Sequence, residues 1–341
     1  MSEWENPIEV TDLSMVAKCR RVALDRAQLL GLGEACYGRV GIAATELGTN
    51  LWKHANRGEL HIQAFQSGSD PGLEILAIDR GPGIGNTSIA MGDGYSTGGT
   101  AGTGLGSIRR QADVFDIYSE INKGTAIVAR FLTASRRPAE NPVPVLNAGA
   151  LSLPIHGETV CGDHWATRSR SGAHVVILAD GLGHGPQAAE ASTMTETVLN
   201  ASKAVDPVVL LEEMHLALRS TRGAATAIAV IHPGTGELNF AGVGNISAMV
   251  LREGKLQHLV SHNGTLGQAI RKLQKFTYPW TADSTLILHS DGLQTNWRLD
   301  SYPGLLKKHP TLIAAILHRD WRRGRDDSSV VVARVQQEEE S

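Results

Sequence analysis

The segment that decides the fold of the first part of the chain is residues 94–106, with the sequence GYSTGGTAGTGLG. Glycine loses more conformational entropy on folding than any other residue, so a run this rich in glycine needs a physical reason. A backbone that approaches phosphate groups closely, and offers them N–H groups where a helix begins, is such a reason. Flexible linkers have a similar composition, so the run alone is weak evidence for a nucleotide site.

Two upstream features strengthen the nucleotide interpretation. Glu46, Asn50 and His54 are spaced by four within a helix predicted over residues 34–55, so they lie on one face of it. The sequence DRGPG at 79–83 directly follows an apolar predicted strand. A solvent-exposed polar stripe is the alternative interpretation of the helix face. The ordered set of acid and amide on a helix, strand, Asp-x-Gly-x-Gly and glycine-rich loop predicts a nucleotide site.

The pattern of apolar residues predicts an α+β organisation in each half of the chain. In the first half it predicts helices over 15–30, 34–55 and 104–113 and strands over 60–65, 73–79, 114–119 and 125–131. A Pro-rich polar stretch that is typical of a linker follows. Beyond it, helices are expected over 186–203 and 206–219, and strands over 148–154, 159–165, 174–179, 225–232, 237–243, 248–252, 284–289 and 328–335.

Residues 10–131 resemble a GHKL ATP-binding domain, the fold of histidine kinases and anti-sigma-factor kinases. Within that group they most resemble the RsbT-type switch kinases. The stretches that carry the resemblance are ELGTNLWKHANRGEL, IDRGPGI, GDGYSTGGTAGTGLGSIRRQADVFDIYS and KGTAIVARF. The resemblance implies a Bergerat α/β sandwich that uses ATP with Mg²⁺ to phosphorylate Ser or Thr on a small STAS-domain protein.

The same resemblance implies a role for each matching position. Asn50 would hold Mg²⁺ against the ATP phosphates, and Glu46 would orient or deprotonate the attacking hydroxyl. Asp79 would accept a hydrogen bond from the adenine amino group. The other nucleotide-binding positions that it implies are Lys53, His54, Gly81, Gly83, Gly102, Gly104, Gly106 and Thr125, with the glycines at 102, 104 and 106 forming the phosphate lid.

Four aspartates of the second half, Asp163, Asp180, Asp291 and Asp327, each lie beside an apolar run. A single Asp-Gly pair usually marks a turn. Four such positions around strands that could converge fit instead a carboxylate-rich site for hard divalent cations. Two cations a few ångströms apart can share a hydroxide that attacks phosphorus.

Residues 148–335 resemble the metal-dependent type 2C protein phosphatases, specifically the SpoIIE/RsbX branch, through ADGLGHGP, TRGAATAIAVI, FAGVGNISAMVL, HSDGL and RDDSSVVV. The resemblance implies an αββα sandwich that holds two Mn²⁺ or Mg²⁺ ions. Asp180 would bridge both ions and be central to catalysis, with the Gly181 carbonyl helping one ion. Asp291 and Asp327 would complete one site and Asp163 the other; Asp326 is the competing position for Asp327.

Two further questions concern the phosphate group and stay open at this point. His184 would approach the phosphate or is a loop histidine. Arg168 and Arg170 are candidates for the phosphate-binding cation that this branch often lacks. The Arg-rich patch over 319–325 is interpreted as a solvated loop or helix end.

Composition excludes several classes of function. The chain has 32 Lys and Arg against 35 Asp and Glu, a net charge of −3, which does not support nucleic-acid or anionic-membrane binding. Its three cysteines form no CxxC pair, so buried or idle thiols are expected rather than a disulfide framework. No signal peptide and no apolar run long enough to span a membrane is evident, so the expected location is the cytoplasm.

These observations predict a GHKL domain over 1–133, a linker over 134–147, a phosphatase domain over 148–336 and an acidic tail over 337–341. We expect a bifunctional protein serine/threonine kinase and metal-dependent protein serine/threonine phosphatase that acts on a STAS-domain partner in a partner-switching pathway. A downstream regulator released by that switch is a further partner that the resemblance implies. The alternative is a nucleotide-gated, partner-sequestering module fused to an active phosphatase.

Overall fold

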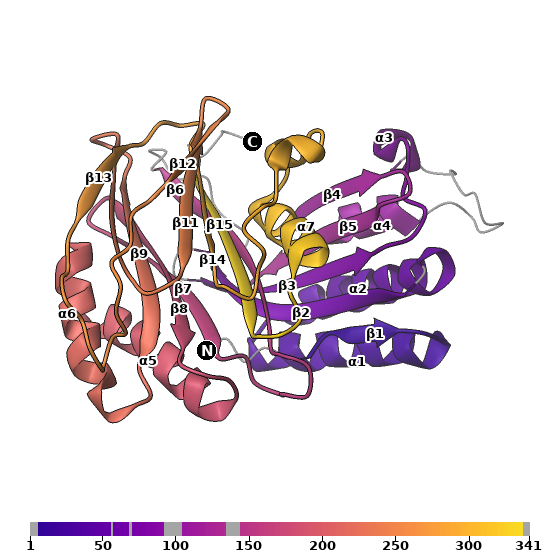
Figure 1. The fold of residues 1–341 in the computed structure, drawn as a ribbon. Coiled ribbons are helices and arrows are strands. Elements are labelled where there is room, and N and C mark those ends of the chain that lie inside the picture. The colour runs from indigo at the N-terminus through magenta and orange to yellow at the C-terminus, as the bar shows by residue number, and fades with distance from the viewer. Residues whose placement is uncertain (1–5, 56, 68–69, 92–103, 134–143, 337–341) are drawn as a thin grey trace. The chain divides into compact units, whose positions relative to one another are not determined.

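A computed structural model of the chain describes residues 6–55, 57–67, 70–91, 104–133 and 144–336. The chain divides into two compact units (Figure 1). The first consists of Met1–Arg137 together with Asp300–Leu312, and the second of Pro138–Leu299 together with Ile313–Ser341. The segment Asp300–Leu312 therefore groups with the N-terminal part, although it lies within the range expected for the phosphatase domain.

The first unit is built on a five-stranded antiparallel sheet with the order β1-β2-β3-β5-β4. The strands are β1 (Ile8–Val10), β2 (Gly58–Ser67), β3 (Asp70–Asp79), β4 (Val114–Glu120) and β5 (Gly124–Leu132). Helices α1 (Leu13–Leu29) and α2 (Glu34–His54) lie side by side on one face of the sheet (Figure 1). The short helices α3 (Thr87–Ala90) and α4 (Gly104–Gln111) complete the unit.

The two long helices form because their apolar residues recur at helical spacing, and α1 also has a side-chain cap. The Asp12 carboxylate caps α1 by accepting from the backbone N–H of Ser14 at 2.7 Å. Each helix buries one stripe against the sheet, where α1 contributes Val16, Cys19, Ala23 and Ala27, and α2 contributes Val40, Ala43, Ala44, Leu47 and Leu51. This layer of apolar contacts holds the polar face of α2 at a defined place.

A charged group is buried in the same unit. Glu74 on β3 is 0% exposed, and its Oε2 atom accepts from Arg130 Nε of β5 at 2.6 Å. Thr311, in the segment Asp300–Leu312, donates its hydroxyl to the same oxygen at 2.8 Å. A carboxylate without water needs such partners, so this network specifies how the segment meets the sheet.

The second unit contains two five-stranded antiparallel sheets. One has the order β13-β10-β9-β8-β7 and the other β12-β11-β14-β15-β6. Their strands are β6 (Val145–Leu153), β7 (Asp163–Arg170), β8 (Ala173–Gly181), β9 (Ala224–His232), β10 (Glu237–Val243), β11 (Ser247–Arg252), β12 (Lys255–His258), β13 (Phe276–Pro279), β14 (Thr285–His289) and β15 (Ser328–Gln336).

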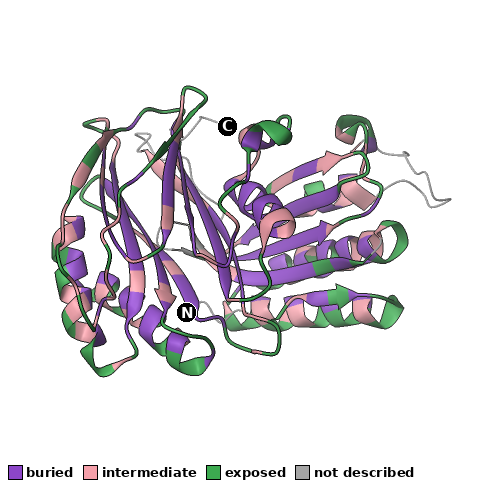
Figure 2. Ribbon diagram, in the orientation of Figure 1, coloured by how far each residue is buried: buried purple, intermediate pink, exposed green. Residues whose placement is uncertain are grey.

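Apolar side chains fill the space between these two sheets and the space between the first sheet and its helices α5 (Pro186–Ala201) and α6 (Pro207–Ala217). Figure 2 shows the resulting concentration of buried residues along the strands. Helix α7 (Pro310–Trp321) lies next to β15, where His318 Nε2 is 2.7 Å from Ser328 Oγ. The expected α+β class, with a helix-covered sheet followed by a two-sheet sandwich, is confirmed.

Most predicted elements are present with small shifts at their ends. The strand expected over 159–165 begins instead at Asp163 and runs to Arg170. Helix α7 was not predicted, because Leu312–Leu317 are all 0% exposed and the helix has no polar face in that stretch to show a helical period. The short strands β1, β12 and β13 were not predicted either. The acidic tail and most of the linker lie outside the described residues.

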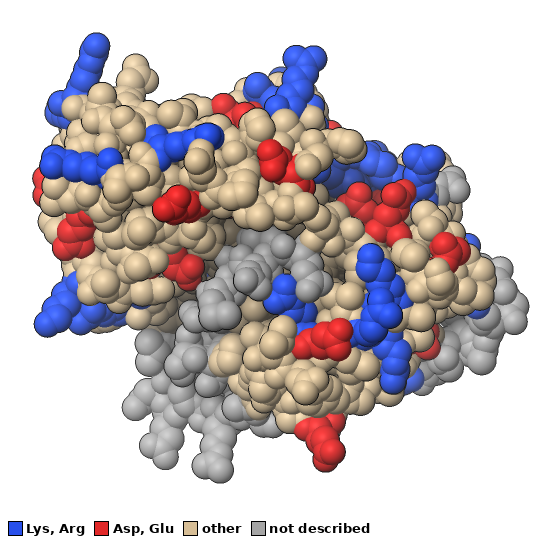
Figure 3. All heavy atoms as spheres, turned by 90° about the horizontal axis from the view of Figure 1, so that it is seen from below, with Lys and Arg blue, Asp and Glu red and all other residues tan. Residues whose placement is uncertain are grey.

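The surface and the thiols agree with the composition. Basic and acidic side chains are interspersed on the face shown in Figure 3, without a single-sign field. Cys19, Cys36 and Cys161 are buried free thiols, as expected. Among the described helices, none has the length and apolar character needed to cross a bilayer.

Candidate functional site

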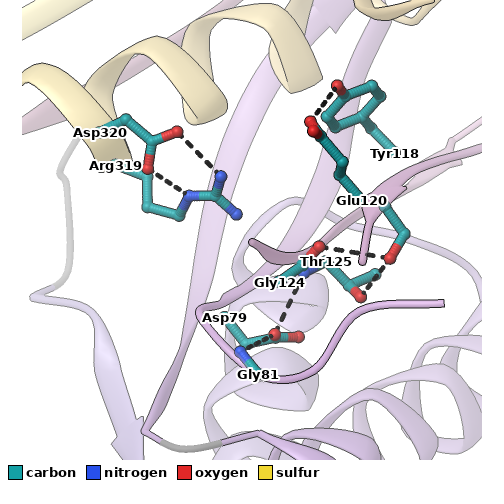
Figure 4. A network of polar contacts seen from close by, with 9 residues as sticks. Asp79, Gly81, Tyr118, Glu120, Gly124, Thr125, Arg319 and Asp320 are labelled. Carbon is teal, nitrogen blue, oxygen red and sulfur yellow. Dashed lines mark hydrogen bonds and ion pairs between the residues drawn. The ribbon is translucent and has the colours of Figure 1, made fainter. Parts of the chain in front are cut away.

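The Asp79 carboxylate lies at the end of β3, where two backbone N–H groups hold it (Figure 4). Its Oδ1 atom accepts from the N–H of Gly81 at 2.7 Å and from the N–H of Thr125 at 3.1 Å. The first bond closes the turn after the strand, and the second ties the turn to the start of β5. The fold thus brings together Asp79 and Thr125, which are far apart in the sequence.

Glycines next to Asp79 allow the backbone to pack where side chains cannot. Gly83 has φ +72°, and a Cβ built on it would lie 2.1 Å from the carbonyl oxygen of Glu120. A Cβ on Gly81 would lie 2.7 Å from the carbonyl oxygen of His54 at the end of α2. These positions require glycine because of close backbone approach.

Ser119 on β4 is a residue of this site that the sequence did not reveal. Its hydroxyl accepts from the N–H of Ile84 at 2.7 Å and lies 2.8 Å from Thr125 Oγ1. Ser119 therefore connects the Gly83 turn to the buried Thr125 side chain. A serine on a strand has no distinctive spacing, so only the tertiary contacts identify it.

The second cluster of the first unit lies where α2 meets the start of α4. A Cβ built on Gly104 would lie 3.4 Å from Glu46 Oε2 and 3.5 Å from Asn50 Oδ1. The acid and the amide therefore face the first turn of α4, whose backbone N–H groups have no partner within the helix. Amide oxygen, carboxylate and helix-start N–H groups are the chemistry that a Mg²⁺-bound triphosphate requires.

The remaining nucleotide positions are less informative. Lys53 and His54 follow Asn50 on α2 with exposed side chains, and Gly106 is buried within α4. Gly102 lies outside the described residues, as does most of the glycine-rich loop.

In the second unit, Asp163 on β7 lies directly opposite Asp180 on β8 in the strand register. Asp163 is 2% exposed, and its Oδ2 atom accepts from Ser290 Oγ at 2.6 Å. Its Oδ1 atom is buried and has no hydrogen-bond partner within the part of the chain that the structure describes. A buried carboxylate oxygen left in this state is costly. A divalent cation would satisfy it, so the residues fit a metal site.

The pKa values of all four aspartates are raised, chiefly because their carboxyl groups are buried. Burial raises the pKa of Asp163 to about 7, although the hydrogen bond from Ser290 opposes this. Burial, together with the charges of Asp163 and Asp291, raises the pKa of Asp180 to about 9. The pKa values of Asp291 and Asp327 are also raised, again chiefly by burial. In the absence of a cation, neighbouring carboxylates oppose one another's ionisation. Raised pKa values of this kind are therefore expected where several carboxylates are placed to bind metal ions.

Asp326 and Asp327 are adjacent in sequence but have different surroundings. Asp327 is 2% exposed, and its two oxygens accept from the backbone N–H groups of Ile155 at 2.8 Å and Gly162 at 2.9 Å. Asp326 instead lines a cavity together with Asp291. The Asp327 carboxylate thus joins three chain segments, whereas the Asp326 carboxylate is accessible to a ligand.

Asn245 also contributes to this cluster, since its Nδ2 donates to Asp291 Oδ2 at 2.7 Å. The sequence analysis did not predict this residue. Within the described ranges, no three His, Cys, Asp or Glu side chains converge closely enough to hold a cation by themselves. Water and phosphate oxygens would therefore have to complete the coordination shell, as Mg²⁺ commonly requires.

Arg168 and Arg170 do not serve as the phosphate-binding cation. The Arg168 guanidinium donates to the carbonyl oxygens of Leu199, Ser202 and Ala204, and Arg170 donates to that of Ser202 at 3.3 Å. Both arginines therefore cap the end of α5, where carbonyl groups lack partners within the helix. These contacts give the two arginines a role in capping α5 and lend no support to their interpretation as phosphate ligands.

The turn between β8 and α5 contains two more predicted positions. A Cβ on Gly181 would lie 2.0 Å from the carbonyl oxygen of Ala188, so no larger residue fits there. The exposed His184 ring lies 2.7 Å from Glu158 Oε1 through its Nδ1 atom. The Glu158 carboxylate thus holds the His184 ring at the surface of this turn.

Comparison with known proteins follows the same division of the chain. Residues 10–131 match the model of the histidine kinase-like ATPase domain, and residues 170–336 match that of Stage II sporulation protein E (SpoIIE). The serine/threonine-protein kinase RsbT of Bacillus subtilis (strain 168) is 33% identical over 129 residues, which are 38% of this chain and 90% of RsbT.

Two solved structures resemble the chain over slightly more than half of its length. One, described as "The bacterial stressosome: a modular system that has been adapted to control secondary messenger signaling", has a TM-score of 0.52 and 26% identity and covers 55% of this chain and 99% of that one. The other, RsbX in complex with magnesium, has a TM-score of 0.49 and 22% identity and covers 59% of this chain and 98% of that one. The chain therefore belongs to the histidine kinase-like ATPase family as a relative of RsbT, and its residues 170–336 match the SpoIIE model.

Proposed function

We propose that this chain is a bifunctional regulator that both phosphorylates and dephosphorylates Ser or Thr on a STAS-domain protein, in a partner-switching pathway. The kinase half acts with ATP and Mg²⁺, and the phosphatase half acts with two Mn²⁺ or Mg²⁺ ions. The observation that carries the proposal is that each unit gathers its chemically relevant side chains at one place. Glu46 and Asn50 meet the start of α4, and Asp163 faces Asp180 across two strands.

In the kinase half, the chain's contribution is positioning and charge neutralisation. Asn50 would hold Mg²⁺ against the phosphates, and Glu46 would orient or deprotonate the attacking hydroxyl. Asp79, held by the N–H groups of Gly81 and Thr125, accepts from the adenine amino group. The absence of a side chain at Gly83 lets the turn after Asp79 pack against the carbonyl oxygen of Glu120.

In the phosphatase half, the carboxylates that hold the ions are Asp163, Asp180 and Asp291. We assign the remaining carboxylate to Asp326 rather than to Asp327, because both Asp327 oxygens already accept from backbone N–H groups. Bound ions would neutralise charge on the phosphoryl group and lower the pKa of a water molecule that attacks phosphorus. Ser290 and Asn245 orient Asp163 and Asp291 through their hydrogen bonds.

The test follows the intact mass of a STAS-domain protein incubated with the purified chain. We expect a gain of one phosphate with Mg²⁺ and ATP, and its loss after ATP is removed and Mn²⁺ is added. Asn50→Ala should abolish only the gain, and Asp180→Ala only the loss. Asp326→Ala and Asp327→Asn compare the two adjacent aspartates. We expect Asp326→Ala to abolish Mn²⁺ binding and leave the fold intact, and we do not expect this combination from Asp327→Asn.

Two outcomes would contradict the proposal. Absence of the mass gain while ATP still binds would favour a nucleotide-gated module that sequesters its partner, fused to a phosphatase. Absence of the loss with Mn²⁺ bound would remove the phosphatase half for that substrate.

A further inference from the structure

The second unit contains a cavity of about 500 Å³ beside the proposed metal carboxylates. Its lining combines both signs of charge: Asp291, Asp326, Arg323 and Arg325, with the polar Gln294, Thr295 and Asn296. A volume of this size accommodates a small polar group with its solvent. The carboxylates lie on the side of the cavity that belongs to the site described above, so the arginines are its new element.

The structure divides the Arg-rich patch into two pairs. The Arg319 guanidinium forms an ion pair with Asp320 at 2.8 Å, and Arg322 donates to the carbonyl oxygen of Pro154. Arg323 and Arg325 are exposed and line the cavity instead. The expectation of a solvated patch therefore holds for Arg323 and Arg325, which are exposed, and not for Arg319 and Arg322, whose guanidinium groups bind the protein itself.

Backbone contacts hold the arginine pair next to the metal carboxylates. The N–H of Arg323 donates to the carbonyl oxygen of Gly292 at 2.9 Å, one residue after Asp291. The N–H of Gln294 donates to the carbonyl oxygen of Trp321 at 3.0 Å, so the two segments run side by side. Gly324, with φ +70°, turns the chain between the two arginines. The pair is therefore fixed in position by the backbone, although its side chains reach solvent.

We propose that Arg323 and Arg325 form the phosphate-recognition site of the phosphatase half, which binds the phosphorylated Ser or Thr segment of the substrate at the cavity beside Asp291 and Asp326. This inference rests on the proposed phosphatase function. Arginine suits the role because its planar guanidinium stays charged and donates two parallel hydrogen bonds to a phosphate. It also supplies the cation that Arg168 and Arg170 do not.

The location explains why positively charged side chains are needed beside the proposed metal carboxylates. Four carboxylates around the site would repel a phosphate dianion, and even bound metal ions leave Asp326 and Asp291 close to the approach path. Two fixed positive charges at the edge of the same cavity offset that repulsion for the incoming substrate. Because the arginines would contact the ground-state phosphate, their loss should affect binding more than turnover.

The experiment measures binding separately from hydrolysis. The probe is a fluorescein-labelled peptide that carries a non-hydrolysable phosphonate analogue of phosphoserine, and its anisotropy gives Kd for the full chain without metal and with Mn²⁺. We expect the double variant R323A/R325A to raise Kd at least about tenfold, the factor that corresponds to about 1.4 kcal/mol. The double variant R323K/R325K, which keeps the charge but loses the planar fork, should fall between it and the wild type.

Arg271→Ala is the matched control, because Arg271 is also an exposed arginine of the second unit but does not line this cavity. It should leave Kd unchanged, and a peptide with unmodified serine should bind all variants equally weakly. An unchanged Kd for R323A/R325A, an equal rise for Arg271→Ala, or a wild type that binds no phosphonate peptide in either form would overturn the inference.

Hydrolysis of the phosphoserine peptide with Mn²⁺ separates this inference from the proposed function. If the wild type hydrolyses the peptide, R323A/R325A should raise KM about tenfold with little change in kcat. Hydrolysis with the same KM in wild type and variant would refute the arginine site and leave the phosphatase function standing. Binding that depends on the arginines without any hydrolysis would refute the phosphatase function and leave the phosphate site standing.

Discussion

Ser290 connects the local structure to the proposed metal site through its hydroxyl, and Ser290→Ala removes both hydrogen bonds of that hydroxyl. The hydroxyl donates to Asp163 Oδ2 at 2.6 Å and accepts from the N–H of Ser329 at 3.0 Å, both in a buried setting. A hydrogen bond to a charged group contributes about 1.5–3 kcal/mol. Loss of a group that orients a metal ligand usually weakens metal binding by about 10–100-fold. We expect Ser290→Ala to weaken Mn²⁺ binding by that factor near neutral pH.

The effect should depend on pH in a defined direction. The Ser290 hydrogen bond lowers the pKa of Asp163, which burial raises to about 7, so its removal raises this pKa further. Protons then compete more strongly with the metal for the carboxylate. The affinity deficit of Ser290→Ala should therefore be larger at about pH 6.5 than at about pH 8.5, where more of the carboxyl is ionised in both proteins.

Isothermal titration calorimetry with Mn²⁺ at the two pH values measures this directly. Ser192→Ala is the control, because Ser192 is also fully buried but donates only to the carbonyl oxygen of Ala189 within its own helix, at 3.2 Å. If Ser290→Ala binds Mn²⁺ as tightly as the control at both pH values, Asp163 is not a ligand that Ser290 orients, and the reasoning is wrong.

Three further predictions concern other parts of the chain. Arg130→Met leaves the buried Glu74 carboxylate without its ionic partner and should destabilise the protein in urea by about 3–5 kcal/mol, whereas adding Glu74→Gln should recover part of the loss; no recovery would contradict the pairing. Gly83→Ala should weaken binding of a labelled ATP analogue about tenfold, because its Cβ would lie 2.1 Å from a carbonyl oxygen, while Gly38→Ala, with nothing within 4 Å, should not. The pKa of Asp180 is raised to about 9, so its stabilising contribution in the metal-free protein is complete below 3.8, the ordinary pKa of an aspartate, and is lost as the pH rises through about 9. Thermal melts of Asp180→Asn without metal should show a smaller loss of stability over that range, and an unchanged slope would exclude this group as its source.

The sequence predicts the nucleotide-site candidates of the first unit because their signals are local. Glu46 and Asn50 share a helix face by spacing alone, and Asp79 with its following glycines is a continuous motif. Such signals can be recognised in the sequence because the residues concerned are only a few positions apart. The helix-covered sheet and the two-sheet sandwich follow similarly from periodic apolar patterns.

The assignment of charged residues to roles could not be made from the chain alone. Arg168 and Arg170 are close in sequence to Asp163, yet they cap α5. Arg323 and Arg325 follow Asp291 by more than thirty positions, yet hydrogen bonds between their segments bring them to its cavity. The packing of strands and helices decides which acceptor lies within reach of a guanidinium. The sequence does not contain the distance between the two groups in the folded chain.

The sequence by itself determined which side chains are candidates for metal and phosphate binding, because carboxylates, an amide and glycines at short spacings are typical of such sites. Only the tertiary structure decided which of two adjacent aspartates binds the backbone N–H groups of Ile155 and Gly162 and which lines the cavity, because these partners lie far away in the sequence. It also revealed Ser290, Ser119 and helix α7. Each acts through contacts between distant segments or through complete burial, and neither leaves a periodic trace in the sequence.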